Sequence, residues 1–134
     1  IRNTELQGAR MKKRYIFLIV ILILIGVPML NFLLIKQRIN QEMQRVARSG
    51  SAKKLIEEII KRQDPKAFTD EGIIKSYEID YDSVEHNPMG GFSMFAYVNG
   101  DKDLYFNFSF DNYSGLKIGI YSMSRKLNHM LRGE

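Results

Sequence analysis

The chain has 134 residues, a formal net charge of +5 and no cysteine. Without cysteine there is no disulfide framework, thiolate metal site, thiol nucleophile or lipid attachment at cysteine. Basic residues concentrate in residues 1–14 and 36–66, whereas residues 67–134 hold more Asp and Glu than Lys and Arg. Nucleic-acid binding usually needs a basic patch on the folded module itself. We therefore expect no nucleic-acid partner, and the basic flanks suit anionic lipid headgroups.

Residues 15–35 form the first predicted element, a transmembrane helix. The run from Tyr15 to Ile35 holds no charged residue, and at about 1.5 Å per residue it matches the roughly 30 Å hydrocarbon core of a bilayer. A cleaved signal peptide is the main alternative, because the preceding MKKR is a typical basic start. The apolar run is longer than that of a signal peptide, however, and no small-x-small cleavage site follows it. We expect a retained single-pass anchor in the cell membrane.

The charges that flank this segment predict its orientation. Residues 1–14 form a basic tail with more positive charge close to the helix than Lys36 and Arg38 supply on the other side. Cytoplasmic flanks carry the excess of Lys and Arg, so we expect a cytoplasmic N-terminus and an extracellular C-terminal domain. Residues 1–10 precede the natural start MKKR. They are interpreted either as a native upstream extension or as a cloning remnant, and they are left out of the fold.

Two residues interrupt the apolar run, and both are candidate contacts of the membrane helix. Pro28 would free a backbone carbonyl one turn earlier and could kink the helix. Asn31 could donate a hydrogen bond to a partner helix. The alternative is that water or the helix's own backbone satisfies Asn31.

Two helical segments follow the membrane segment. Residues 36–50 are predicted as a juxtamembrane helical linker, because apolar residues recur on one helical face at Ile35, Ile39, Met43 and Val46. The Ser-Gly-Ser stretch at 49–51 predicts a break, with Ser51 as the N-cap of the next helix. That helix has an apolar stripe at Leu55, Ile56, Ile59 and Ile60. Asp64-Pro65 ends it, since the residue before proline avoids the α region.

From residue 73 the apolar period changes from helical to alternating, which predicts four strands. The inward sets are Ile73, Tyr77, Ile79 and Tyr81; Phe92, Met94, Ala96 and Val98; Leu104, Phe106, Phe108 and Phe110; and Leu116, Ile118 and Ile120. Residues 87–91 and 111–115 form turns, and Asn99-Gly100 is a strong hairpin signal. Ser124 is predicted to cap a short helix that turns Leu127, Met130 and Leu131 inward.

The predicted architecture is α+β. A helix packs on a four-stranded antiparallel meander, a short C-terminal helix follows, and residues 51–134 form an extracytoplasmic domain. The arrangement resembles cystatin-like folds, an analogy of fold that implies no protease inhibition.

Catalytic and metal-binding signals are scarce. The two histidines, His86 and His129, are interpreted as solvated, and Glu85-His86 would point to opposite faces of a strand. Asp80, Asp82, Asp101 and Asp103 are candidates for a calcium site, but the glycine and distant glutamate of an EF-hand loop are missing. We expect them to be solvated charges. No nucleophile elbow, P-loop or dinucleotide fingerprint is present. We expect a protein that is not an enzyme, with no metal, no cofactor and no small-molecule substrate.

Aromatic residues at outward strand positions are the main candidate for a binding surface. Phe95, Tyr97 and Tyr105 have the parity opposite to the predicted core. Exposed aromatic side chains on a sheet face can form a protein-binding patch. The alternative is cross-strand pairing beneath the linker helix or the C-terminal helix. The neighbouring loop completes the candidate partner-binding set with Asn87, Pro88 and Met89.

Two segments resemble a known family, HNPMGG at 86–91 and YVNGDKDL at 97–104. They are similar to the family catalogued as domain of unknown function 1310, small membrane-anchored proteins of Gram-positive bacteria. The MKKR start with its apolar anchor, Asp64-Pro65 and SMSRKL at 122–127 resemble the same family, so the likeness runs from Met11 to the C-terminus. The resemblance implies a Firmicute envelope protein, and it implies no activity and no catalytic residue.

Two functions of different classes follow from these observations. The first is a membrane-anchored extracytoplasmic module that binds a protein, in its most concrete form an immunity protein that neutralises a secreted toxin or bacteriocin. The second is a non-catalytic accessory subunit of an envelope transport or secretion complex that acts through its transmembrane helix. An enzyme, such as a carboxylate-based hydrolase, is the least favoured class.

Overall fold

The computed structural model describes residues 2–133, with side chains from Arg10 onward. The chain divides into two compact units, one up to Ile39 and one from Asn40. Helix α1 (Arg2–Ala47) supplies the described part of the first unit, and its last residues, from Asn40, belong to the second unit. It stays helical through Pro28. Within the described residues, α1 is the one helix long and apolar enough to span a membrane, and none of its most apolar window is buried by the protein.

The second unit begins inside the predicted linker. Met43 and Ala47, both on α1, are buried in its core. Helix α2 (Gly50–Gln63) then starts after a single extended residue, Ser49, whose hydroxyl accepts a hydrogen bond from the Ala52 N–H. The prediction that Ser51 is the N-cap is therefore wrong. Ser51 lies in the first turn, because the chain leaves helical geometry at Ser49.

The core face and the end of α2 match the sequence pattern. Its buried residues are Ala52, Ile56, Ile59 and Ile60. The helix ends at Asp64, which has an extended conformation before Pro65. The Asp64 carboxylate accepts hydrogen bonds of 2.8 Å from the N–H groups of both Ile73 and Ile74. This anchor turns Ile74 into the core, whereas Ile73, the predicted inward residue, is 38% exposed.

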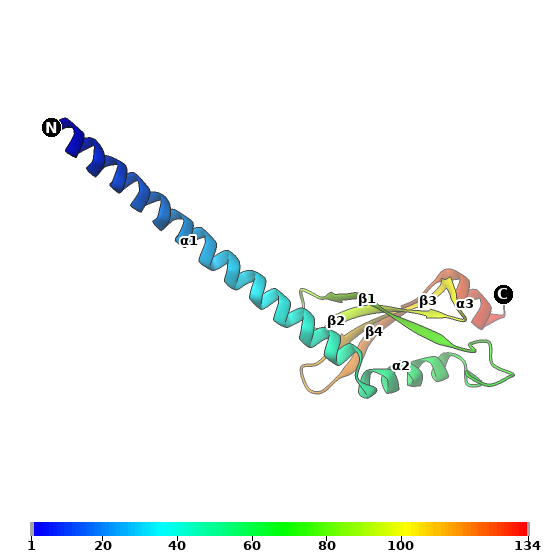
Figure 1. The fold of residues 1–134 in the computed structure, drawn as a ribbon. Coiled ribbons are helices and arrows are strands. Elements are labelled where there is room, and N and C mark those ends of the chain that lie inside the picture. The colour runs from blue at the N-terminus through cyan, green and yellow to red at the C-terminus, as the bar shows by residue number, and fades with distance from the viewer. Residues whose placement is uncertain (1, 134) are drawn as a thin grey trace. The chain divides into compact units, whose positions relative to one another are not determined.

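The sheet is the predicted antiparallel meander of four strands in the order β1-β2-β3-β4 (Figure 1). The strands are β1 (Tyr77–His86), β2 (Phe92–Val98), β3 (Asp101–Asp111) and β4 (Lys117–Met123). Asn99 and Gly100 both have positive φ, at 56° and 69°, as a tight hairpin turn requires. The inner face of β2 and β3 is buried as predicted, at Phe92, Met94, Ala96, Val98, Leu104, Phe106, Phe108 and Phe110.

One strand breaks the predicted alternation. Between β3 and β4 the register shifts by one residue, so that Ile118 lies opposite Phe110 but Ile120 lies opposite Ser109. Ile120 is consequently on the outer face and 73% exposed. The prediction that Ile120 points inward is wrong, because a bulge at Gly119 changes the parity of the residues that follow. Tyr121 and Met123 take the inward positions and pack against the core.

Helix α3 (Arg125–Arg132) closes the second unit. Ser124 caps it as predicted, and its hydroxyl accepts the N–H of Leu127 at 3.3 Å. Leu127 is fully buried, but Met130 is 36% exposed and does not face the core. Lys126 forms a 2.8 Å ion pair with Asp101, and this contact lowers the pKa of the Asp101 carboxyl.

Candidate binding surface

The outer sheet face brings the three predicted aromatic residues together. Tyr97 of β2 lies directly opposite Tyr105 of β3, and Phe95 lies opposite Asn107. The rings of Phe95 and Tyr105 pack edge to face, with centroids 5.5 Å apart and an angle of 76° between their planes. All three side chains are partly exposed. We call Phe95, Tyr97 and Tyr105 the aromatic patch.

The helices of the second unit place their buried residues on the other face of the sheet. The core contains Met43 and Ala47 of α1, the apolar stripe of α2 and Leu127 of α3, together with the inward strand residues. The neighbours of the aromatic patch on the outer face, Ser93, Asn107 and Ser109, are partly exposed. The patch therefore keeps solvent access, whereas the alternative prediction placed it beneath the linker helix or the C-terminal helix.

An acidic strand borders the aromatic patch. Asp80 of β1 lies opposite Phe95, and its carboxylate accepts hydrogen bonds from the Tyr97 hydroxyl at 3.3 Å and from the Asp82 N–H at 3.2 Å. Desolvation raises the pKa of Tyr97, and the charge of Asp80 and its hydrogen bond raise it further. The Tyr97 hydroxyl is thus kept protonated and directed toward β1.

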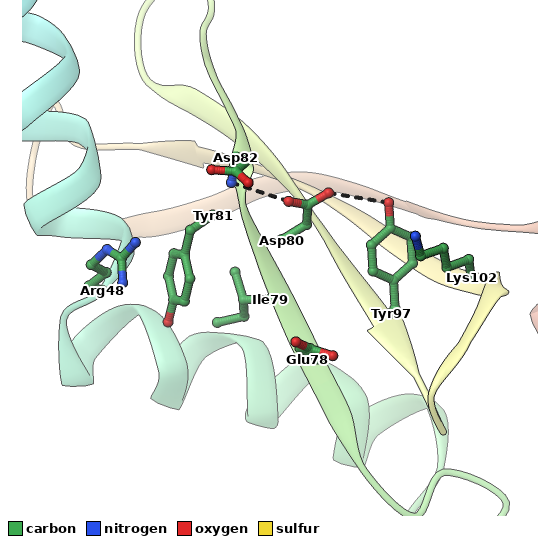
Figure 2. Close-up of a pocket in the computed structure, with 8 residues that line it drawn as sticks. All are labelled: Arg48, Glu78, Ile79, Asp80, Tyr81, Asp82, Tyr97 and Lys102. Carbon is green, nitrogen blue, oxygen red and sulfur yellow. Dashed lines mark hydrogen bonds between the residues drawn. The ribbon is translucent and has the colours of Figure 1, made fainter.

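A cavity of about 570 Å³ opens beside this strand (Figure 2). Carboxylates of β1 line it together with Tyr97 and with two basic side chains, Arg48 and Lys102. Arg48 follows α1, and its guanidinium lies 4.1 Å from the centre of the Tyr81 ring, a cation–π contact that fixes its position. The cavity therefore combines acidic groups, aromatic surface and two cations from different elements.

The second predicted segment, the loop with Asn87, Pro88 and Met89, joins β1 to β2 at the opposite end of these strands from Asn99-Gly100. Asn87 reaches the outer face, where its side-chain oxygen accepts from the Ser93 hydroxyl at 3.4 Å. Pro88 is exposed. Met89 is 91% exposed, and its carbonyl accepts from the Tyr113 hydroxyl at 3.0 Å. Of this loop, only Asn87 is tied to the face that carries the aromatic patch.

The remaining predicted positions lie on exposed surfaces. In the part of the chain from 2 to 133, no group of three or more His, Asp or Glu residues is placed to hold a metal ion. Glu85 and His86 are both exposed on β1. Pro28 and Asn31 are exposed on α1, in the first unit.

Sequence reasoning considered Asp80 only for calcium binding and missed its contact with the aromatic patch, and it did not single out Arg48 or Lys102. Asp80 has the outward parity of β1, so alternation could have identified it, but its partner Tyr97 follows only from the strand register. Arg48 and Lys102 are distant in sequence and carry no local signal of a shared cavity.

These features define a class, an α+β protein with an apolar N-terminal helix and an uncovered, aromatic outer sheet face. The sequence model of a family described as "Protein of unknown function (DUF1310)" matches residues 15–130. The chain belongs to this family, which confirms the resemblance. No curated protein and no solved structure matches the chain, so the cystatin-like label stays a prediction.

Proposed function

We propose that the chain is a membrane-anchored binding module that captures a protein outside the cytoplasm with its outer sheet face. One observation carries the proposal. The aromatic patch gathers three partly exposed rings on a sheet face that the helices of the same unit leave open. Tyr and Phe are enriched in the centres of protein interfaces, where they supply much of the binding energy. The concrete version is an immunity protein that neutralises a secreted toxin or bacteriocin.

The apolar segment of α1 and the basic residues beside it support this proposal. The apolar segment of α1 has no protein cover in the described residues, so a bilayer is the natural environment for it. The basic residues at 10–14 exceed those at 36–38, which favours a cytoplasmic N-terminus and an extracellular second unit. Binding rather than catalysis fits a surface whose titratable groups are tied to one another, such as Tyr97 with Asp80.

Site-specific photocrosslinking tests the proposal in the cells that produce the chain. A photoreactive phenylalanine analogue replaces Tyr97 or Tyr105 of the full-length chain, and cross-linked proteins are identified by mass spectrometry. The same analogue at Glu58, an exposed position on α2, is the matched control. We expect one protein to cross-link from both sheet positions and not from Glu58. Equal cross-linking from all three positions would contradict the proposal.

A different observation, on the membrane helix, supports a second function. Asn31 is a polar residue on the exposed surface of the apolar segment, and such residues can hydrogen-bond a neighbouring helix in a membrane. The chain would then be an accessory subunit of an envelope transport or secretion complex. Cross-linking from Asn31, with none from Tyr97 or Tyr105, would support this function and reject the first.

Deletion of the gene tests the immunity version of the proposal. Deletion of the gene should make them sensitive to a toxin in the supernatant of their own culture, and the wild-type chain should restore resistance. A variant with Phe95→Ser and Tyr105→Ser should be present in the membrane at wild-type level without restoring it. Unchanged resistance after deletion would reject the immunity version and leave protein capture to the cross-linking test.

A further inference from the structure

Strand β1 has a free edge. It lies at the end of the sheet and pairs with β2 alone among the strands of residues 2–133. An unpaired edge presents backbone N–H and C=O groups to any extended chain that approaches it. The acceptors and donors on this edge decide what can bind there.

The alternation of hydrogen bonds between β1 and β2 identifies the backbone groups of β1 that are free. The N–H of Asn99 donates to the carbonyl of Ser76 at 2.9 Å. Because bonding residues alternate along an antiparallel pair, the backbone groups of Glu78 and Asp80 also face β2. The Ser83 hydroxyl agrees with this phase, since it bridges the Asp80 carbonyl and the Phe95 N–H. The N–H and C=O groups of Tyr77, Ile79 and Tyr81 consequently face the free edge.

One end of the edge is already occupied by a side chain. The amide of Gln44, on the part of α1 that belongs to the second unit, donates a 2.7 Å hydrogen bond to the Tyr81 carbonyl. A donor of an added strand would make the same contact. Gln44 therefore ends the free edge at Tyr81, and the segment from Tyr77 to Tyr81 stays open.

Cavities lie along both faces of this segment. The 570 Å³ cavity runs around the free edge, with Asp80 and Tyr97 on its outer side and Ile79 and Tyr81 on its inner side. A second cavity of about 460 Å³ lies on the inner side with Lys53 and Glu57 of α2. Both are lined by Glu78, Ile79 and Tyr81. Side chains of a strand alternate between the two sides of a sheet. An added strand would therefore place its side chains alternately on the outer side, beside Asp80 and Tyr97, and on the inner side, beside Ile79 and Tyr81.

The two sides differ in chemistry. Toward the outer side β1 presents the carboxylates of Glu78 and Asp80, with Asp82 close by (Figure 2). Toward the inner side it presents Tyr77, Ile79 and Tyr81, which pack against the core. Cross-strand neighbours are most favourable when opposite charges or apolar groups face each other. The three carboxylates outnumber the one neighbouring cation of β3, Lys102. The outer positions therefore favour basic side chains, and the inner positions favour apolar ones.

A second copy of the chain fits this edge poorly. The strand Tyr77–His86 contains Glu78, Asp80, Asp82 and Glu85 and no Lys or Arg. Antiparallel pairing of two such strands would place carboxylates opposite carboxylates, and like charges directly opposite each other are destabilising.

We infer that the free edge of β1 pairs with an extended segment of the partner protein in which basic and apolar residues alternate. The inference rests on the proposed function and names the part of the partner that is recognised. Backbone hydrogen bonds to Tyr77, to Ile79 and to the N–H of Tyr81 hold the segment. The different chemistry of the two sides of the edge selects its sequence, as in other cases of strand addition.

A synthetic peptide tests this inference directly. The probe is fluorescent acetyl-KVKVKVK-amide, titrated by anisotropy against the full-length chain in nanodiscs of uncharged phosphatidylcholine. We expect saturable binding, and about tenfold weaker binding for KKKKVVV, which has the same composition without alternation, and for Glu78→Lys, which adds a like charge at the edge. Glu58→Lys makes the same charge change on the exposed face of α2 and should bind as wild type.

Hydrogen exchange distinguishes strand pairing from charge attraction. Bound peptide should slow amide exchange at Tyr77, Ile79 and Tyr81, and a peptide N-methylated at alternate residues should neither bind nor protect. Equal binding of KVKVKVK and KKKKVVV, or binding with no protection of these amides, would overturn the inference. No binding of any peptide would also overturn it. If cross-linking from Tyr97 and Tyr105 then still captures one partner, the proposed function stands without strand addition.

Discussion

The two faces of the sheet carry aromatic residues with the same alternating period but in different surroundings. On the inner face Phe106, Phe108 and Phe110 are buried, and the rings of Phe106 and Phe108 stack with centroids 5.3 Å apart. On the outer face Phe95 and Tyr105 also pair, yet both remain partly exposed. Periodicity therefore shows that a strand has two faces. The position of the helices decides which face is buried in the core and which stays accessible to solvent.

The largest contrast should appear when one phenylalanine is removed from each face. Phe108→Ala should lower the free energy of unfolding by about 3–5 kcal/mol, because it leaves a cavity among buried rings. Phe95→Ala should cost about 1 kcal/mol, since it loses an edge-to-face pair on an accessible surface. Urea unfolding of the full-length chain in detergent micelles, followed by near-UV circular dichroism, measures both. Equal losses would show that the outer face is as deeply packed as the inner one.

Gly91 tests how closely β2 and β3 must approach where the inner face begins. Its φ is +74°, and an added Cβ would overlap the backbone carbonyl oxygen of Phe110. Gly100 has a similar φ of +69° but open space around it. We expect Gly91→Ala to destabilise by about 2–4 kcal/mol and Gly100→Ala by about 1–2 kcal/mol. The same urea assay compares them, and equal effects would remove the steric argument.

Much of the fold could be predicted because buried and partly exposed residues alternate along β2 and most of β3 without interruption. Their inward residues follow from parity alone, and Asn99-Gly100 fixes the turn between them. The predictions of inward residues fail where a local feature changes which face of the sheet the next side chains occupy. Gly119 turns Ile120 outward, and the hydrogen bonds from Ile73 and Ile74 to Asp64 turn Ile74 inward. Such shifts depend on tertiary contacts, which the local pattern does not contain.

The candidate site was predictable in part for the same reason. The aromatic patch follows from the outward parity of β2 and β3. The cavity beside it does not, because Arg48 and Lys102 approach β1 only in the folded chain. The predicted meander places β1 at one edge of the sheet. It does not show whether a helix or a loop covers that edge, so the free edge also had to be found in the folded chain.

The pH dependence of stability compares two tyrosines on opposite faces. Desolvation raises the pKa of Tyr77, and so does its 3.0 Å hydrogen bond to Glu57. The folded state thus favours the neutral phenol, so its stabilisation is present below the unfolded pKa of about 10 and is lost as pH rises through the folded pKa. Tyr77→Phe should flatten the loss of stability above about pH 10. Tyr97→Phe should flatten it less, because Tyr97 lies on the outer face, whereas Tyr77 packs against the core. Urea midpoints measured on both sides of that pH decide between them, and identical slopes for wild type and Tyr77→Phe would contradict the assignment.

The smallest expected effect tests the bulge at Gly119, which changes the face that the following residues of β4 occupy. Ile118 packs against the core opposite Phe110, whereas Ile120 is 73% exposed opposite Ser109. Ile118→Thr should lower the free energy of unfolding by about 1–2 kcal/mol, because a hydroxyl replaces apolar packing. Ile120→Thr should stay within about 0.5 kcal/mol of wild type, as surface substitutions do. If both substitutions cost the same in urea unfolding, β4 alternates without a bulge and Ile120 belongs to the core. The inward positions of Tyr121 and Met123 would then fail with it, since all three depend on the same shift at Gly119.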